Sequence, residues 1–353
     1  MTVSLYPFPQ YHHPPRAGFS ELPFCRDGVR CIPPGQLEWE SAGGFGELRI
    51  QRHRTGEWSR GICGLLPSAA FSSGLVRPHE ATLQSRLARQ EILTREEGGA
   101  LGKPVLLTTP QLAKWWARVD GEYVAEGGAV TFVGNDNTYH LRRYLPRMGQ
   151  LPQPLDLAEA ELLCIADGHH RAATHAALAA QGYAACAFLP VCIIGGEEVS
   201  IGSFTRVIED DMGNTDEVLK RLGAYFMIEA TPSAIIPSVP GEWAFSRNHL
   251  HYRLTRKSPQ GRETAAEWLD AQVLAPVFGI VDSKRDHRIT FEMAPEPGDD
   301  LAQRNFLPDR TYLSHFPLTT DRFFAEVAAG RMLPAKSTRF EPRVPSGMLV
   351  WMP

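Results

Sequence analysis

One segment constrains this sequence more than any other: an apolar run that ends at Asp167-Gly168 and continues at once into an alanine-rich stretch. The run 162–166 predicts a buried strand, and 172–181 predicts an amphipathic helix. The turn between them reads Asp-Gly-His-His-Arg, residues 167–171. A helix N-terminus offers free backbone N–H groups and the positive end of the helix dipole, which favour a phosphate or carboxylate. The segment therefore predicts an anion-binding site.

Bulk composition excludes several classes of protein. The 353 residues, 43% hydrophobic and 22% charged, predict a sizeable core in two domains or one large elaborated domain. A net charge of -4 provides no global basic field for nucleic acid. No apolar stretch approaches the ~20 residues of a membrane span, and the N-terminus lacks a secretory pattern, so we expect a cytoplasmic protein. The oligomeric state stays open.

The cysteines and histidines do not predict a metalloprotein. The six cysteines form no CxxC pair, which favours reduced thiols, with Cys164 and Cys192 in core strands. A zinc hydrolase would need His79 and the histidines of the helix, but His170 and His175 are five residues apart and point to different faces.

The order of predicted elements indicates the fold class. Residues 1–44 are rich in proline and predict an irregular arm, followed by a core over 45–210 and a C-terminal α/β portion over 211–353. Helices and strands alternate without a strict βαβ series, which predicts an α+β fold or a mixed-sheet α/β fold. Within it we expect a helix over 80–95, opened by Glu80, and a last strand over 348–351.

Four segments together resemble the bacterial family known as domain of unknown function 1015. These are GLVRPHEATLQSRLARQEIL at 74–93, IADGHHRAATHAAL at 165–178, GSFTRVI at 202–208 and MLPAKSTRFEPRVPSGMLV at 332–350. Their order and spacing match across residues 45–353. Two positions depart from the family pattern: Thr205 stands where the family usually has His, and Ser85 where an acidic residue is common.

The Asp-Gly-His turn is also similar to that of the ParB/sulfiredoxin-like fold and its free-serine kinase branch. This resemblance implies an α+β fold whose mixed sheets form a ParB/sulfiredoxin-like nucleotide-binding core, with additional α/β elaboration. It further implies ATP or ADP as cofactor, held at the helix after the turn, and a small hydroxylated acid as the second substrate. Function at this level rests on analogy and on the chemistry of the site.

Phosphoryl transfer requires groups that neutralise phosphate charge, a metal bridge and a residue that orients or deprotonates the acceptor. The segment 167–171 supplies candidates for each. Gly168, His169, His170 and Arg171 are candidate phosphate ligands, and Asp167 a candidate Mg²⁺ ligand or base. The alternative for Asp167 is a helix cap.

Two further residues follow the His-Glu motif near position 80. Glu80 is the second candidate catalytic group, beside Asp167 and His169, and its alternative is a first-turn residue favoured by the helix dipole. Arg86 is a candidate phosphate ligand or a structural partner of Glu80.

Residues further along the chain are candidates to bind the acceptor, the small hydroxylated acid. Arg206 is a candidate to bind its carboxylate, with ordinary surface pairing as the alternative, and the adjacent Thr205 is a candidate substrate ligand. A second group of candidates for a carboxylate or phosphate lies between a helix and a strand, without the glycines of a P-loop: Lys336, Ser337 and Thr338. Together with these candidate residues, the resemblance to the free-serine kinase branch implies a small-molecule kinase of the free-amino-acid type, with a hydroxylated acid such as serine as substrate. A nucleotide-binding switch with slow hydrolysis and a protein partner, or an anion-binding protein without catalysis, are the alternatives.

Overall fold

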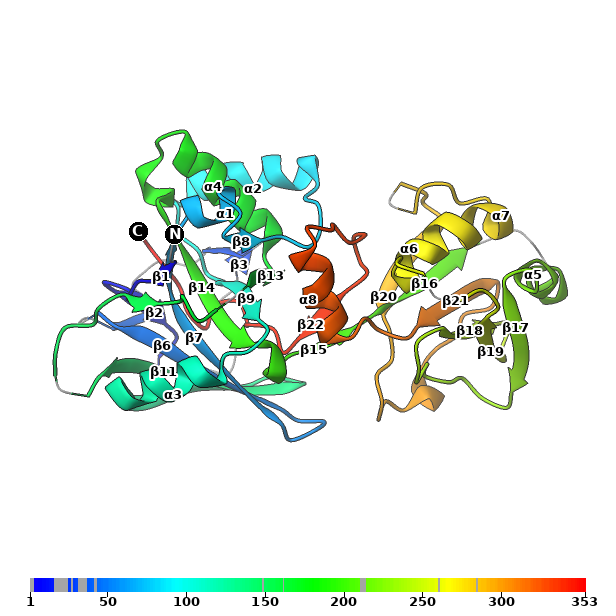
Figure 1. Cartoon of the computed structure of the whole chain (residues 1–353), viewed down its shortest axis with the longest axis horizontal. Coiled ribbons are helices and arrows are strands. Elements are labelled where there is room, and N and C mark those ends of the chain that lie inside the picture. Colours follow the sequence, from blue (N-terminus) through cyan, green and yellow to red (C-terminus); the bar gives the residue numbers. More distant parts are fainter. Residues whose placement is uncertain are drawn as a thin grey trace. The chain divides into compact units, whose positions relative to one another are not determined.

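The structure is a computed structural model in which the chain divides into two compact units (Figure 1). It describes residues 3–15, 25–26, 28–30, 37–40, 43–147, 149–160, 162–209, 214–259, 261–283 and 285–353. Unit 1 comprises Met1–Ser200, Phe324–Met332 and Pro342–Pro353, and unit 2 comprises Ile201–Phe323 and Leu333–Glu341. Helices occur with mixed and antiparallel sheets, so the predicted α+β class is confirmed.

Unit 1 is built on an eight-stranded mixed sheet. Its order is β10 (Tyr123–Val133), β11 (Asn137–Pro146), β6 (Phe45–Arg52), β7 (Trp58–Pro67), β14 (Phe188–Gly195), β9 (Val105–Thr109), β13 (Leu163–Asp167) and β8 (Val76–Arg77). The pairs β9–β14 and β8–β13 are parallel, and the others are antiparallel. Continuous apolar runs form the central strands, which is the pattern of strands buried on both faces.

In the described part of unit 1, this sheet is accompanied by the helices α1 (Ala69–Ser72), α2 (Gln84–Glu96), α3 (Ala113–Glu122) and α4 (His169–Ala180). Helix α4 packs against α1 and α2 (Figure 1). Helix α3 buries Trp115 and Trp116, and the Trp116 ring contacts Tyr144 of β11 at a centroid distance of 6.2 Å. Buried residues of the central strands and of each of these helices contribute to a shared hydrophobic core.

Both ends of the chain join unit 1. The N-terminal segment pairs β1 (Ser4–Leu5) with β12 (Leu155–Asp156), and β2 (Tyr11–His13) with β5 (Glu38–Glu40); β3 (Cys25–Arg26) pairs with β4 (Val29–Arg30). At the C-terminus Val350 bridges His12, and Trp351 bridges Leu101. The sequence predicted a strand over 348–351, and the structure has isolated bridges there instead. The described part of the predicted irregular arm therefore contains short strands with buried side chains, including Leu5 and Phe8.

Unit 2 is built on a six-stranded antiparallel sheet. Its order is β17 (Phe226–Thr231), β19 (Leu250–Arg256), β18 (Glu242–Arg247), β21 (Arg310–His315), β16 (Phe204–Glu209) and β20 (Ile289–Met293). Helix α5 (Thr215–Leu222) and a continuous helical stretch of α6 (Ala265–Leu269), a π-helical segment (Asp270–Leu274) and α7 (Ala275–Phe278) pack with this sheet around a second core. Strand β15 (Ser200–Gly202) pairs with β22 (Arg339–Glu341).

Among the described residues, the remaining elements are α8 and three short 3-10 helices. Helix α8 (Thr320–Ala328) runs across the boundary at Phe323, and the 3-10 helices cover Ala184–Cys186, Gly196–Glu198 and Leu301–Gln303. Helix α2 begins at Gln84, so the prediction that Glu80 opens it is wrong: Leu83 is extended, with a ψ of 128°. Cys164 and Cys192 are free and buried, as predicted.

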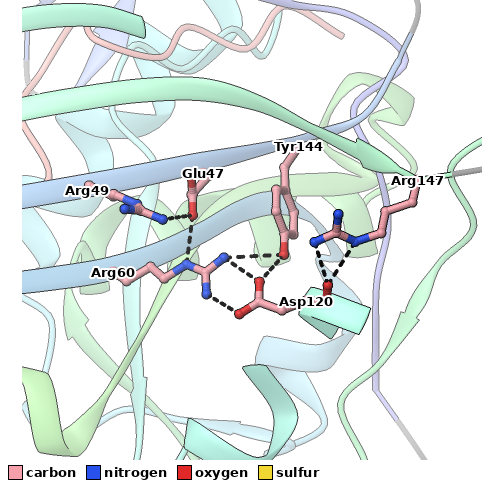
Figure 2. A network of polar contacts seen from close by, with 6 residues as sticks. All are labelled: Glu47, Arg49, Arg60, Asp120, Tyr144 and Arg147. Carbon is pink, nitrogen blue, oxygen red and sulfur yellow. Dashed lines mark hydrogen bonds and ion pairs between the residues drawn. The ribbon is translucent and has the colours of Figure 1, made fainter. Parts of the chain in front are cut away.

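A polar network ties α3 to the sheet of unit 1 (Figure 2). The guanidinium of Arg60 donates from Nη1 and Nη2 to both carboxylate oxygens of Asp120, at 2.7 and 2.6 Å, and from Nε to Glu47 Oε1 at 2.8 Å. Its Cζ lies 3.8 Å from the centre of the Trp116 ring. Glu47 is 1% exposed, so Arg60 and the neighbouring Arg49 supply the charge that makes its burial tolerable.

Replacement of Arg60 should therefore destabilise unit 1. We expect Arg60→Met to lower the free energy of unfolding by about 3 kcal/mol, because the buried Glu47 carboxylate then loses one of its two cations and keeps Arg49. The matched control is Arg95→Met, which removes an exposed pair with Glu91 on α2 and should cost less than about 1 kcal/mol. Urea denaturation followed by circular dichroism measures both; equal losses would contradict the role given to Arg60.

Candidate functional site

The predicted turn is formed as the sequence indicates, with a glycine that the geometry requires. Strand β13 ends at Asp167, and α4 begins at His169 after Gly168, whose φ of 103° is left-handed. A Cβ at residue 168 would lie 2.7 Å from Arg171 Nη2 and 3.1 Å from Val105 Cγ2. Gly168 thus allows both the backbone turn and the close approach of the Arg171 guanidinium.

Asp167 is surrounded by cations. Lys103 Nζ lies 2.9 Å from Asp167 Oδ2, and Arg171 Nη2 donates to the same oxygen at 3.2 Å. Burial by itself raises the pKa of the Asp167 carboxyl, but the charges of Arg171, Lys103 and Arg343 hold it well below its usual range. Burial lowers the pKa of Lys103, and Asp167 opposes that effect. Three cations around one carboxylate leave a net positive charge at the start of α4.

This arrangement does not fit Asp167 as a Mg²⁺ ligand. Lys103 and Arg171 both contact Asp167 Oδ2, and their positive charges oppose the binding of a further cation by the same carboxylate. Across the described ranges, no three His, Cys, Asp or Glu side chains are grouped so as to hold a metal ion. Asp167 is likewise no helix cap, since Gly168 is the N-cap and no side chain bonds it.

His169 connects the turn to Glu80. Its Nδ1 lies 3.8 Å from Glu80 Oε1, and its ring meets that of His79 edge-on at a centroid distance of 4.5 Å. Burial first, and the neighbouring His79 second, lower the pKa of His169 well below its usual value. His169 Nε2 is buried without a hydrogen-bond partner. Burial also lowers the pKa of His79 to about 4, and His79 Nδ1 bonds the carbonyl of Ile165 at 2.7 Å.

His170 and Arg86 differ in their relation to the turn. The backbone N–H of Leu83 donates to His170 Nε2 at 3.0 Å, so this imidazole fixes the segment that precedes α2. The side chain of Arg86 is exposed on α2, and within the described part of the chain it makes no hydrogen bond or ion pair to the turn. His170 thus connects the turn to the segment before α2, whereas Arg86 makes no such connection.

Arg206 and Thr205 lie in unit 2 on β16 and are closed off from solvent. Arg206 is 0% exposed; its Nη1 donates to the carbonyl of Phe204 at 3.3 Å, and its Nη2 lies 3.8 Å from Asp270. The Thr205 hydroxyl is 2.7 Å from that of Ser314 and accepts from Arg304 at 3.3 Å. Neither side chain is presented to a dissolved acceptor, because both are buried in the packing of unit 2.

Lys336, Ser337 and Thr338 also belong to unit 2. Lys336 has a φ of 61°, and its exposed ammonium lies 5.2 Å from the centre of the Phe204 ring. Ser337 and Thr338 are buried and line a cavity of about 170 Å³. The Ser337 hydroxyl donates to the carbonyl of Pro334 at 2.7 Å.

The sequence reasoning missed two cations of the cluster at Asp167. Lys103 precedes Pro104 and strand β9, and β9 pairs with β13, the strand that ends at Asp167. The sequence feature that could have indicated Lys103 is a lysine at the start of a buried strand. Arg343 lies within the C-terminal segment 332–350 already singled out. Gly28 also contributes: its carbonyl accepts from the backbone of Lys103 at 3.1 Å, and a Cβ there would lie 2.7 Å from Arg171 Cδ.

A comparison with protein families identifies the family of this chain. A family model described as protein of unknown function, DUF1015, matches residues 46–278, and this span includes the turn at 167–171. The chain belongs to the DUF1015 family. No curated protein matches the sequence.

Several solved structures are similar to this chain, with low TM-scores and low sequence identities. SbnI from Staphylococcus aureus, with a C-terminal truncation, has a TM-score of 0.43 at 15% identity, over 80% of this chain and 85% of that one. A free serine kinase in complex with AMP has a TM-score of 0.41 at 17% identity, over 80% and 89%. A conserved hypothetical protein from Pyrococcus furiosus has a TM-score of 0.40 at 16% identity, over 80% and 93%. Identities of 15–17% and TM-scores of 0.40–0.43 do not establish an activity for this DUF1015 chain.

The structure also bears on the expectation about membranes. Within the ranges that the structure describes, every helix of this DUF1015 protein is too short or too polar to cross a membrane.

The charge cluster predicts a pH dependence of stability. We expect Asp167→Asn to lower the free energy of unfolding at pH 7 by about 2 kcal/mol, because three cations then lose their common anion. The folded pKa of Asp167 is lowered, so its contribution is fully present above the unfolded pKa of about 3.9 and is lost as the pH falls through the folded value. The difference between wild type and Asp167→Asn should therefore hold from pH 7 to about 5 and shrink below about 4.

Urea unfolding between pH 3 and pH 7 measures this difference. Asp136→Asn, an exposed position in unit 1, is the control and should leave the pH profile unchanged. A difference that stayed constant down to pH 3 would show that the Asp167 charge does not stabilise the fold.

Proposed function

We propose that this DUF1015 protein transfers a phosphoryl group from ATP or ADP to the hydroxyl of a small hydroxylated acid such as serine. The observation that carries the proposal is the excess of positive charge at Asp167-Gly168, where Lys103, Arg171 and Arg343 surround one carboxylate. Nucleotide phosphates carry several negative charges and require neutralisation before a hydroxyl can attack them.

The turn suits a phosphate more than a carboxylate. Helix α4 directs its free N-terminal N–H groups and dipole toward the same point as the cations. A singly charged carboxylate would be matched by one cation, whereas this site keeps a surplus after Asp167 is paired. A phosphate with two negative charges restores the balance, and Asp167 then holds Lys103 and Arg171 in position.

The transfer needs a group that takes the proton of the acceptor. In the proposed reaction the acceptor oxygen attacks the terminal phosphorus, the bond from phosphorus to the bridging oxygen of the nucleotide breaks, and the hydroxyl proton passes to Glu80. The products are a phosphate monoester and a nucleotide shorter by one phosphate. Glu80 is assigned this role rather than Asp167, because the surrounding cations make the Asp167 carboxylate a poor proton acceptor.

His169 is assigned a positioning role beside Glu80. Its lowered pKa keeps the ring neutral at pH 7, so it does not add positive charge at the phosphate. Its Nδ1 faces the Glu80 carboxylate at 3.8 Å. Since Asp167 does not fit a metal, no step of the proposed reaction is assigned to a metal held by that residue.

Two variants separate nucleotide binding from transfer. Lys103→Met should weaken the binding of ATP or ADP by about tenfold or more, because it removes a buried cation from the phosphate site. Glu80→Gln should bind nucleotide within about twofold of wild type while transfer falls by about 100-fold or more. Isothermal titration measures binding, and phosphorus NMR of mixtures with L-serine measures transfer.

Lys114→Met, an exposed lysine on α3, is the control for Lys103→Met. If wild type binds nucleotide but forms no phosphate ester with serine or glycerate, the nucleotide-binding switch replaces the kinase. If no nucleotide binds, or if Lys103→Met binds as well as wild type, the phosphate site itself is rejected.

A further inference from the structure

One face of the sheet of unit 1 carries polar side chains around an exposed tryptophan. His140 on β11 lies opposite Arg49 on β6, and Arg142 lies opposite Glu47. Trp58 on β7 pairs with the residue two positions after Arg49. Residues that lie opposite each other, and residues two apart on one strand, point to the same face of a sheet. The register therefore gathers these five side chains on one face.

The same five side chains line a hollow of about 280 Å³. This volume is close to the lower end of the range for small-molecule sites, roughly 300–1,000 Å³. Strands β7, β14 and β9 lie between β6 and β13, the strand that ends at the turn. At about 4.8 Å between neighbouring strands, β6 and β13 are roughly 19 Å apart. The hollow is thus separate from the phosphate site proposed at the turn.

The indole of Trp58 is held in place and remains accessible. It is 48% exposed, and it stacks on the His140 ring at a centroid distance of 5.6 Å and an interplanar angle of 27°. His140 Nδ1 lies 2.9 Å from the hydroxyl of Thr131 on β10. Burial, and then the charges of Arg142 and Arg49, lower the pKa of His140, so the ring is neutral at pH 7. An indole supported in this way offers a stacking surface to a planar ring.

The charges around the hollow leave one cation in excess. Arg49 donates to Glu47 Oε1 at 3.2 Å and keeps half of its side chain exposed. Arg60 donates to the same oxygen and to both oxygens of Asp120 (Figure 2). Arg142 is exposed, and within the described ranges it has no hydrogen bond or ion pair. Three guanidiniums thus face two carboxylates, and the excess charge lies at the hollow.

An adjoining hollow limits how much anion this face accommodates. It has a volume of about 210 Å³, shares Arg49 and Trp58, and is completed by Ser59, Arg60 and Glu198. Arg60 is committed to its carboxylates, and Glu198 accepts from the backbone N–H of Arg60 at 2.7 Å. Among the described residues of this second hollow, no further cation is available for another phosphate. The face therefore matches one ring and one phosphate, rather than a nucleic acid strand or a nucleoside triphosphate.

We propose that the hollow lined by Trp58, Arg49 and Arg142 binds a nucleoside monophosphate. Its base packs against the indole of Trp58, and its phosphate lies between the two guanidiniums. Guanidinium groups bind phosphate oxygens through charge-assisted hydrogen bonds, and aromatic side chains stack on bases without strong sequence preference. The site is independent of the proposed kinase function, and no chemical step is assigned to it.

Tryptophan fluorescence of the full-length protein tests the two parts of the ligand. The chain has seven tryptophans, so the change that AMP causes in wild type and not in Trp58→Phe is the signal of this site. AMP should give a saturable Trp58 signal. Adenosine, which lacks the phosphate, and ribose 5-phosphate, which lacks the base, should each bind at least about tenfold more weakly. Equal affinity for AMP and ribose 5-phosphate, or the absence of a saturable signal, would overturn the proposal.

Arg142→Gln tests the same site by counting ligands. Isothermal titration should show one AMP fewer per chain than in wild type, whether or not the turn also binds a nucleotide. Because Arg142 has no partner among the described residues, the melting temperature should stay unchanged. Arg95→Gln, on the exposed side of α2, is the control and should bind as many AMP molecules as wild type. An unchanged count in Arg142→Gln would refute the site.

Lys103→Met separates this site from the phosphate site at the turn. It should leave the Trp58 signal with AMP unchanged, since Lys103 lies beside β13. Loss of that signal in folded Lys103→Met, verified by circular dichroism, would assign the AMP response to the turn and reject the hollow. Weaker binding of ATP or ADP in Lys103→Met concerns the proposed function alone.

A single-stranded oligonucleotide of ten adenylates tests the class of ligand. It should bind no more than about tenfold more tightly than AMP, because the adjoining hollow provides no cation for further phosphates. Much tighter binding that depends on Arg142 would replace the mononucleotide by a nucleic acid strand.

Discussion

The ion cluster around Asp167 is the interaction on which the architecture of the turn depends. A carboxylate at the end of β13 draws Lys103 from the segment before β9 and Arg171 from the first turn of α4. Both cations are largely buried, and neither would be stable there without an anion. Gly168 makes the arrangement possible, because a side chain at that position would collide with the Arg171 guanidinium. The backbone turn and the charge cluster therefore require each other.

The same cluster decides which chemistry the turn supports. A carboxylate bound by cations is a weak base and a poor metal ligand, so the two roles first expected of Asp167 are both disfavoured. What remains is a surplus of positive charge beside a helix N-terminus. In the proposed reaction the proton is therefore assigned to another group, the Glu80 carboxylate, whose Oε1 lies 3.8 Å from His169 Nδ1.

The sequence predicts the local features well, because they are encoded by neighbouring residues. The strand, the turn glycine and the helix after it follow from hydrophobic period and from the positive φ that glycine tolerates. The start of α2 was misplaced because Glu80 and the apolar residues after it fit a helical period, although Leu83 is extended. Lys103 and Arg343 were missed because no local sequence pattern specifies their proximity to Asp167. Lys103 lies near it through the pairing of β9 with β13, and Arg343 through the return of the C-terminal segment to unit 1. The burial of Arg206 depends in the same way on the tertiary packing of unit 2.

Burial has one further consequence for how the histidines of this protein act. His79, His169 and His315 all have lowered pKa values, chiefly because burial disfavours the charged ring. Sequence reasoning treats histidine as a proton carrier near neutral pH, since its ordinary pKa lies there. In this structure these rings are instead neutral groups whose hydrogen-bonding roles are fixed by what each nitrogen faces. At the turn, burial thus separates two tasks: the Asp167 carboxylate, which keeps a quarter of its side chain exposed, carries charge, and the buried imidazoles of His79 and His169 orient the groups beside them.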